Sequence, residues 1–573
     1  MTAVLHSGHR AASRRPDGGT SVTRGLLDVL AAWGARRIYC CPGSTEAAVL
    51  DALVTRDDIE LVLVTHESVA VAMAEGDARS TGHPAVAYLH TNVGMANGLA
   101  HLSSAQLSRA PVLVLNGLKA TTLAGRGAFT TLAHPADMVR QHVKWSHVCA
   151  AAELVADDVD RALRAAVAEP AGPVWLGLPQ DLLEAEVPDP LPGPRRAAVT
   201  TLTRPAPEAV AAAASLLARA RRPVLVAGGE VARRHAVGRV AALAERLGAP
   251  VFDEGRRDFL ASAVPTAHPL HAGLYDPAHP AVQDADVVAF LGCRMFTEFE
   301  GGPSADLPAS ARLVHLHPDP LETGRLHPVD APLTGDPALA LDDLLAALPP
   351  GSPAARAPHP SAKGPGRPPA GTGRFPGHHG LGPVVEALAV AVEEADATVI
   401  LDATTATVPL LRGLRTTRPG QLLSSTSGSL GWGMGSALGV ALAEPGRPVA
   451  ALLGDGAFQF GLPALWTAQR YQIPVTFIVL NNRTYSAVAS ALSRFAGAAV
   501  AQDRWPGTDI AGLDIAAVAR AFGLPSEQVT GGERLARAAA VALGRRGPSV
   551  LEVITGPEHP PARDPADNSE ELA

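Results

Sequence analysis

The feature that most constrains the fold is an alternation of short β-rich runs with Ala- and Leu-rich segments of helical length, repeated along the chain. The predicted strands are residues 61–65, 85–90 and 111–116, then 223–227, 287–291 and 312–316, then 398–403, 449–453, 475–480 and 549–554. Apolar strands joined by helices of about 10–15 residues indicate parallel sheets covered on both faces. The chain is therefore predicted to be α/β, with three doubly wound parallel-sheet domains.

Two proline-rich stretches, residues 187–194 and 349–380, divide the 573 residues. The second holds almost no aliphatic residue, so it cannot bury a core and is predicted to be a linker. The predicted organisation is a disordered tail over 1–19, domains over 20–190 and 195–348, a Pro/Gly-rich linker over 349–379, a third domain over 380–560 and a C-terminal tail over 561–573.

Composition excludes several classes of protein. The chain has 48 Lys+Arg against 56 Asp+Glu and a net charge of −8, which argues against a nucleic-acid binder. Its apolar runs fall short of the about 20 residues that span a bilayer, and its first residues lack the apolar core of a signal peptide. The four cysteines form neither a disulfide framework nor a zinc motif. We therefore expect a cytoplasmic protein that binds neither nucleic acid nor membrane.

Polar residues follow two strands of the third block. Gly454, Asp455 and Gly456 come directly after residues 449–453, and Asn481-Asn482-Arg483-Thr484 follows residues 475–480. In a doubly wound sheet both loops lie at the carboxyl edge, where ligands bind. The flanking glycines allow a close approach to an anion, and carboxylate, amide and carbonyl oxygens suit Mg²⁺ bridging to phosphate. Taken alone, G-D-G also fits a simple turn.

The two elements together resemble the diphosphate motif of the thiamine-diphosphate (ThDP) enzyme superfamily, which begins with G-D-G and ends in N-N. The resemblance implies that Asp455, Asn482 and the main-chain carbonyl of Thr484 hold Mg²⁺, with Gly454 and Gly456 beside the diphosphate. It makes the third block a diphosphate-binding domain, the second a central domain and the first a pyrimidine-binding domain.

Further segments fit the same resemblance. Residues 428–433 (GSLGWG) look like the seat of the aminopyrimidine ring, with the Gly428 carbonyl toward its amino group and Leu430 bending the cofactor. Alternatively, these glycines serve close helix packing. Thr404 and Thr405 are expected to donate hydroxyls to the diphosphate; alternatively they cap a helix.

Glu67 lies in the segment Thr65-His66-Glu67-Ser68, where a strand passes into a predicted helix over 68–80. On its own it reads as a first-turn glutamate favoured by the helix dipole. With residues 74–82 (AEGDARSTG), however, the segment resembles the pyrimidine-side motif of ThDP-dependent decarboxylases and synthases. The resemblance implies that Glu67 hydrogen-bonds the pyrimidine N1′ and drives catalysis, and its apolar neighbours predict burial.

Ser44, in Pro42-Gly43-Ser44-Thr45-Glu46, and His90, at the end of a strand, resemble the benzoylformate-decarboxylase group. There the serine contacts the substrate carboxylate and the histidine moves protons. Alternatively, Ser44 caps a helix and His90 is a hydrogen-bonded strand-end residue.

The sequence also departs from that group. Residues 294–314 hold no counterpart of a second active-site histidine, only candidates such as Glu298. Arg483 stands where a glycine is expected, Ala487 matches, and Ala491 replaces a bulky pocket aromatic. His378 and His379 lie at the end of the linker and are expected to be solvated.

The predicted function is ThDP- and Mg²⁺-dependent, non-oxidative decarboxylation of a small-molecule 2-oxoacid to an aldehyde and CO₂. The alternative is an acetolactate-synthase-like carboligase, which joins the enamine to a carbonyl acceptor. The resemblance further implies a homodimer or homotetramer with active sites between subunits.

Overall fold

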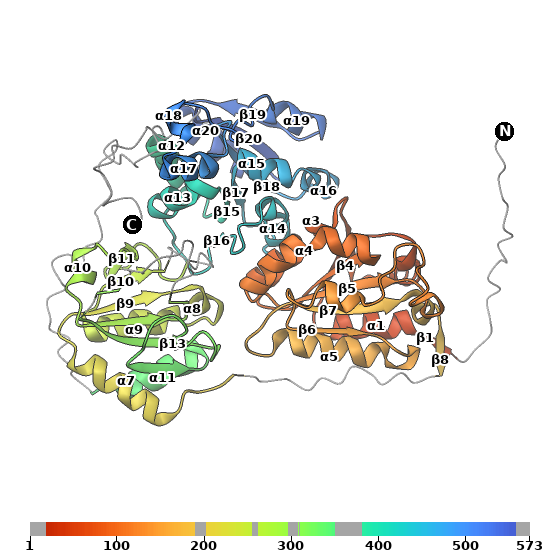
Figure 1. Ribbon diagram of the computed structural model, residues 1–573, viewed down its shortest axis with the longest axis horizontal. Helices are drawn as coiled ribbons and strands as arrows, with labels where there is room; N and C mark the ends of the chain where they lie inside the picture. The colour runs from red at the N-terminus through yellow and green to blue at the C-terminus, as the bar shows by residue number, and fades with distance from the viewer. Residues whose placement is uncertain are drawn as a thin grey trace.

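The computed structural model describes residues 19–188, 202–254, 262–295, 307–308, 310–349 and 381–556. It contains three six-stranded sheets, in each of which all paired strands run parallel, with helices on both faces (Figure 1). The predicted fold class is therefore confirmed. The predicted tails, the 349–379 linker, Glu298, His378 and His379 lie outside the described residues, apart from Gly19 and Pro349.

The first sheet has the order β3-β2-β4-β5-β7-β6. Its strands are β2 (Arg37–Cys41), β3 (Glu60–Leu63), β4 (Ala85–His90), β5 (Val112–Leu118), β6 (Trp145–Val148) and β7 (Val174–Pro179), and its main helices are α1 (Val22–Ala32), α3 (Glu67–Thr81), α4 (Thr91–Leu107) and α5 (Val155–Val167). A short antiparallel ribbon of β1 (Gly19–Ser21) and β8 (Glu186–Pro188) joins the two ends of this domain. The sequence analysis did not predict this ribbon.

The middle sheet has the order β11-β10-β9-β12-β13-β14. Its strands are β9 (Pro223–Ala227), β10 (Val251–Asp253), β11 (His271–Leu274), β12 (Val287–Leu291), β13 (Arg312–His317) and β14 (Ala331–Thr334), with helices α7 (Pro207–Arg219), α9 (Val237–Leu247) and α11 (Pro337–Ala347). Buried Arg109, at the end of α4, donates to His317 Nε2 (2.8 Å) and pairs with Asp319 (3.3 Å). This cluster joins the middle domain to the first.

The third sheet has the order β16-β15-β17-β18-β20-β19. Its strands are β15 (Thr398–Asp402), β16 (Leu422–Ser424), β17 (Val449–Gly454), β18 (Val475–Asn481), β19 (Ser526–Val529) and β20 (Ser549–Ile554). The helices used below are α12 (Leu381–Glu394), α14 (Trp432–Ala443), α15 (Asp455–Phe460), α16 (Pro463–Tyr471), α17 (Ser486–Phe495) and α20 (Gly532–Leu543).

The first and third domains share one hydrophobic core, because α3 packs directly on α14 (Figure 1). Small residues permit this approach: a Cβ added at Gly439 would lie 2.0 Å from the Met73 carbonyl oxygen, and one at Gly76 would lie 2.3 Å from the Ser436 carbonyl oxygen. The contact fixes the start of α3, where Glu67 lies, relative to the start of α14, where the 428–433 segment lies.

Candidate active site

The G-D-G and N-N elements meet at the carboxyl edge of the third sheet. Strands β17 and β18 are neighbours, with Gly454 opposite Leu480. Asp455 begins α15 and is only 6% exposed. Its Oδ2 accepts a hydrogen bond from the Arg483 N–H (2.7 Å) and its Oδ1 accepts one from the Gly456 N–H (2.8 Å). The fold thus joins two segments between which the chain forms α15, α16 and β18.

The loop after β18 presents oxygen atoms next to this carboxylate. Asn482 Oδ1 accepts from the Thr484 N–H (3.0 Å), and the Thr484 carbonyl accepts from the Ser486 N–H (2.9 Å). Arg483 has φ 61°, a left-handed conformation that favours glycine. The fold therefore keeps the glycine-type turn expected here, at the cost of backbone strain at an arginine.

These residues fit a magnesium ion. Burial raises the pKa of Asp455, although several backbone N–H groups lower it in part. Among the described residues no basic side chain is paired with this buried carboxylate. A divalent cation would supply the missing positive charge, and the available donors are all hard oxygens.

The segment after β16 forms a loop with two left-handed glycines, Gly428 (φ 68°) and Gly431 (φ 85°). A Cβ at Gly428 would meet no atom within 4 Å, so its left-handed φ, and not close packing, favours glycine there. At Gly431 and Gly433 the close-packing interpretation is confirmed, because a Cβ would lie 2.8 Å from the Gly461 nitrogen and 2.6 Å from the Asp402 Cβ, respectively. Buried Asp402 accepts a hydrogen bond from the Gly433 N–H (3.0 Å), and burial raises the pKa of Asp402 to about 6. Leu430 lies between the two left-handed glycines, Gly428 and Gly431.

Thr404 and Thr405 follow β15 at the same edge of the sheet. The helix-cap interpretation is wrong for both, because the 3₁₀ turn Thr404–Ala406 has Ala403 as its N-cap. Thr404 is exposed and has φ 47°. A strained, exposed polar residue at a strand end is typical of a ligand-binding position.

Glu67 is the first residue of α3, and His66 is the N-cap. The Asn97 side-chain amide on α4 donates to Glu67 Oε2 (2.9 Å). The Cys41 thiol, at the end of β2, lies near the same carboxyl group, and burial together with the Glu67 carboxylate raises the pKa of Cys41 to about 12. The Glu67 side chain is half-buried in the single chain, whereas Val69, Ala70 and the residues that follow lie in the core.

Ser44 and His90 lie close together at the carboxyl edge of the first sheet. Ser44 is exposed and begins the 3₁₀ turn Ser44–Glu46, whose N-cap is Gly43, so the cap interpretation of Ser44 is wrong. His90 Nδ1 is hydrogen-bonded to Glu46 Oε2 (2.9 Å) and lies 3.0 Å from Thr45 Oγ1.

Glu46 is the residue that the sequence analysis missed. Its side chain is fully buried, and it also accepts from the Gly43 N–H (2.7 Å) and the Thr45 hydroxyl (2.6 Å). A Cβ at Gly117 would lie 1.9 Å from Glu46 Oε1, so the neighbouring strand leaves just enough room for this carboxylate. The available signal was a carboxylate within a short polar segment that follows an apolar strand.

The loops of the first and third domains come together within one chain. His101 on α4 lies 2.8 Å from the Ser68 carbonyl oxygen and 3.4 Å from the Leu430 carbonyl oxygen. The Leu63 N–H donates to the Tyr471 hydroxyl on α16 (2.8 Å). The segment that carries Glu67 and the segment that carries Leu430 therefore lie on the same side of the molecule.

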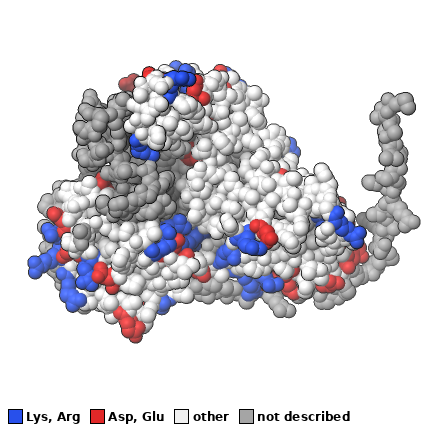
Figure 2. Space-filling view, viewed as in Figure 1, with Lys and Arg blue, Asp and Glu red and all other residues white. Residues whose placement is uncertain are grey.

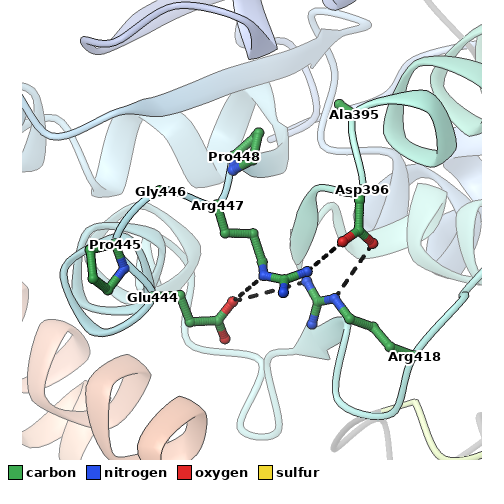
Figure 3. Close-up of a pocket in the computed structure, with 8 residues that line it drawn as sticks. All are labelled: Ala395, Asp396, Arg418, Glu444, Pro445, Gly446, Arg447 and Pro448. Carbon is green, nitrogen blue, oxygen red and sulfur yellow. Dashed lines mark hydrogen bonds and ion pairs between the residues drawn. The ribbon is translucent and has the colours of Figure 1, made fainter.

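A cavity of about 640 Å³ lies at the opposite, amino edge of the third sheet (Figure 3). Arg418 and Arg447 face Asp396 and Glu444 across it, and Arg447 is 2.6 Å from Asp396. Glu444 also accepts from the Ser80 hydroxyl at the end of α3. We interpret this ion-pair network as a link between α3 and the third domain, remote from Asp455.

The proposed pocket residues Ala487 and Ala491 both lie on the exposed face of α17. Phe495, one turn further along, is 83% exposed. In the middle domain, residues 296–306, which include the candidate Glu298, lie outside the described residues. In the described ranges, no helix has both the length and the apolar character needed to cross a bilayer.

Comparison with known proteins finds one family over most of the chain. The models described as "Thiamine pyrophosphate enzyme" match residues 20–138 (N-terminal TPP binding domain), 210–344 (central domain) and 402–553 (C-terminal TPP binding domain). Each matched segment falls within one of the three sheet domains.

Relatives of two named activities cover nearly the full length. Benzoylformate decarboxylase of Pseudomonas aeruginosa is 31% identical over 535 residues, covering 92% of this chain and 97% of the relative. The acetolactate synthase isozyme 1 large subunit of Escherichia coli is 26% identical over 542 residues, covering 92% of each. The crystal structure of benzoylformate decarboxylase from Polynucleobacter necessarius superposes with a TM-score of 0.85 at 27% identity, covering 94% of this chain and 99% of that one.

Proposed function

Because the chain belongs to the thiamine pyrophosphate enzyme family, we propose that it is a ThDP- and Mg²⁺-dependent lyase that decarboxylates a 2-oxoacid. The products would be an aldehyde and CO₂. The observation that carries this proposal is the meeting of Asp455 with the Asn482–Thr484 loop, while Glu67 starts the helix packed against α14. The relatives named benzoylformate decarboxylase support the same reaction class.

In this proposal the third domain holds the cofactor. Asp455, Asn482 and the Thr484 carbonyl bind Mg²⁺, and Gly454 and Gly456 allow the backbone to approach the diphosphate. The Thr404 and Thr405 hydroxyls donate to it, and Gly428 and Leu430 seat the aminopyrimidine ring. When bound, ThDP supplies a cationic ring that accepts the electron pair left by the departing carboxylate, which side chains cannot do.

Glu67 holds a proton at the pyrimidine N1′. A carboxyl group is suited to this task only if its orientation is fixed, and the Asn97 side-chain amide fixes it by donating a hydrogen bond to Glu67 Oε2. The position of Gly94 adds to this, because a Cβ there would lie 2.8 Å from Glu67 Oε1.

Ser44 and His90 act on the substrate. The exposed Ser44 hydroxyl donates to the substrate carboxylate, and His90 Nε2 moves a proton at the substrate carbonyl. Glu46 and Thr45 hold His90 through Nδ1, which leaves Nε2 free to face the substrate. The reaction balances because the carboxylate leaves as CO₂ and the carbonyl carbon takes up one proton.

The test is CO₂ release from a panel of aliphatic and aromatic 2-oxoacids, with ThDP and Mg²⁺ present and Glu67→Gln as the matched control. We expect release with at least one member, and a loss of about 100-fold or more in the variant. Turnover that survives in Glu67→Gln would contradict the role of Glu67. Absence of CO₂ from the whole panel would contradict the decarboxylase proposal.

The second candidate is a carboligase of the acetolactate-synthase type. It is favoured by the absence of histidine from residues 294–314 and by the acetolactate synthase relative. Mass spectrometry of the products from a single 2-oxoacid separates the two: a free aldehyde supports decarboxylation alone, whereas a product that joins two carbonyl units supports ligation.

We also propose a homodimer or homotetramer in which subunits share active sites. The face over α3, α4, α15 and α16 carries few charged side chains (Figure 2). Two of these helices also carry exposed apolar side chains, Val93 on α4 (49% exposed) and Phe460 on α15 (60% exposed). Light scattering after size-exclusion chromatography tests this, and a monomer at working concentration would contradict it. The described cysteines are free thiols, as a cytoplasmic location would require.

A further inference from the structure

His101 is a buried histidine that the proposed reaction does not use. It lies on α4 and is 4% exposed. Its Nδ1 is 2.8 Å from the Ser68 carbonyl oxygen, in the first turn of the Glu67 helix, and its Nε2 is 3.4 Å from the Leu430 carbonyl oxygen. One imidazole ring therefore lies between the first turn of α3 and the loop of the same chain that is proposed to seat the aminopyrimidine ring.

Both partners of this ring are acceptors. A neutral imidazole has one N–H donor and one nitrogen lone pair, whereas an imidazolium donates from both nitrogens. Neutral His101 therefore donates at the shorter contact, to Ser68, and turns a lone pair toward the Leu430 oxygen. Only the protonated ring can bond both carbonyls.

The other two buried histidines among the described residues differ in this respect. His315 Nε2 faces the Cys293 carbonyl oxygen (2.9 Å) and its Nδ1 accepts from the Gly324 N–H (3.1 Å), so the neutral ring satisfies both neighbours. His317 accepts from Arg109 at Nε2 (2.8 Å) and its Nδ1–H faces the Asp319 carbonyl oxygen (3.3 Å), so the neutral ring again satisfies both neighbours. His101 is set apart because its environment lacks a donor for the second nitrogen.

Helix α4 also contacts the same loop at a second point. The Thr426 hydroxyl donates to the Ser104 carbonyl oxygen (3.1 Å), one turn from His101. The 425–431 loop is thus braced by α4 at Thr426 and anchored just beyond its end by the Gly433–Asp402 hydrogen bond (3.0 Å), while His101 is the contact at the Leu430 carbonyl itself. A change at His101 can therefore move the Leu430 end without releasing the whole loop.

We propose that His101 is a positioning residue that ties the Leu430 carbonyl to the start of the Glu67 helix when its imidazole is protonated, and so pre-organises the cofactor loop. This rests on the proposed function, since the loop matters only if it seats the pyrimidine. The link to Leu430 is released when the ring loses its proton, whereas the bond to Ser68 persists in both states.

The charged groups around His101 influence the pH at which its imidazole ring gains a proton. Helix α3 presents His66, Glu67 and Glu75 toward α4, and the 425–431 loop carries no titratable side chain. Burial lowers the pKa of His101, and His66 lowers it further, while the two carbonyls raise it in part. The protonated state therefore forms on the acid side of neutrality. By linkage, a cofactor that fixes Leu430 must raise the pKa of His101.

The experiment measures ThDP affinity by tryptophan fluorescence at fixed Mg²⁺ from about pH 8 to about pH 5, in the wild type and in His101→Gln. Glutamine can donate to one carbonyl but cannot gain a proton. We expect similar affinities at the alkaline end and about fivefold weaker binding by the variant at the acid end, the worth of one hydrogen bond. His315→Gln is the matched control, because an amide can replace both bonds of that ring, and its curve should parallel the wild type.

Parallel curves for wild type and His101→Gln would overturn the inference and leave the proposed function standing, whereas no ThDP binding at any pH would overturn both. If His101→Gln does not fold, the wild type still decides: NMR titration of the His101 ring should show a higher pKa with ThDP bound. An unchanged pKa would overturn the inference.

Discussion

The sharpest test of the first-domain site is Glu46→Gln. In the wild type, Glu46 Oε2 accepts from the Gly43 N–H and from His90 Nδ1, while Oε1 accepts from the Thr45 hydroxyl. The variant's amide oxygen can replace Oε2 and keep both of its bonds. Its amide nitrogen can replace Oε1 and donate to Thr45, because a hydroxyl can reverse its role. The substitution therefore removes one buried charge and leaves the geometry intact.

The expected loss follows from that charge. A hydrogen bond to a charged partner contributes about 1.5–3 kcal/mol and a neutral one about 1 kcal/mol. The positive charge that His90 acquires when it takes a proton thus loses about 0.5–2 kcal/mol of stabilisation. Since about 1.4 kcal/mol is tenfold in rate, kcat should fall about 2- to 30-fold. ThDP affinity should not change, because Glu46 contacts no residue of the third domain in the described structure.

The assay is steady-state CO₂ release with the best 2-oxoacid of the panel, together with ThDP binding. His90→Ala and the double variant complete a cycle, and the double variant should be no slower than His90→Ala alone. Unchanged kcat in Glu46→Gln would refute the reasoning. A parallel loss of ThDP affinity would do so too, because it would indicate a general structural role for Glu46.

Three further predictions concern packing, pH and substrate choice. Gly439→Ala should lower the free energy of unfolding by about 2–4 kcal/mol in urea melts, because its Cβ would lie 2.0 Å from the Met73 carbonyl oxygen. The control Gly238→Ala on α9, whose Cβ would meet no atom within 4 Å, should be neutral or slightly stabilising. Equal effects of the two substitutions would contradict this prediction. Burial raises the pKa of Asp402 to about 6, so protonation of Asp402 favours the folded state. The melting temperature of the wild type, relative to that of Asp402→Asn, should therefore rise as pH falls through about 6. Matching pH profiles of the two melting temperatures would contradict this prediction. Ala491→Phe should lower the ratio of kcat/KM for an aromatic over a small aliphatic 2-oxoacid by about tenfold, and a constant ratio would place Ala491 outside the pocket.

The sheet strands were predictable because their signal is local. Central parallel strands are covered on both faces and so appear as apolar runs, and Ala85–His90, Pro223–Ala227, Val287–Leu291 and Ser549–Ile554 have the predicted bounds. The short ribbon of β1 and β8 was not predictable, since three-residue strands carry no periodicity and their partners are far apart in the chain. Ser44 and the 404–405 threonines were open to a helix-cap interpretation because sequence does not show which residue starts a turn.

What the sequence determined by itself is the set of short motifs: the G-D-G and N-N elements, the Glu67 segment and the order of strands that places such motifs at sheet edges. Each of these motifs consists of consecutive residues, so the sequence shows it directly. Only the tertiary structure decided which distant groups support them. Glu46 holds His90 because strand β2, which precedes Glu46, is paired in the first sheet with β4, which ends at His90. His101 faces Leu430 from 329 residues away because the close packing of α3 on α14 brings the first and third domains together. Contacts of this kind depend on the shapes of two packed surfaces, and a linear sequence does not record which surfaces meet.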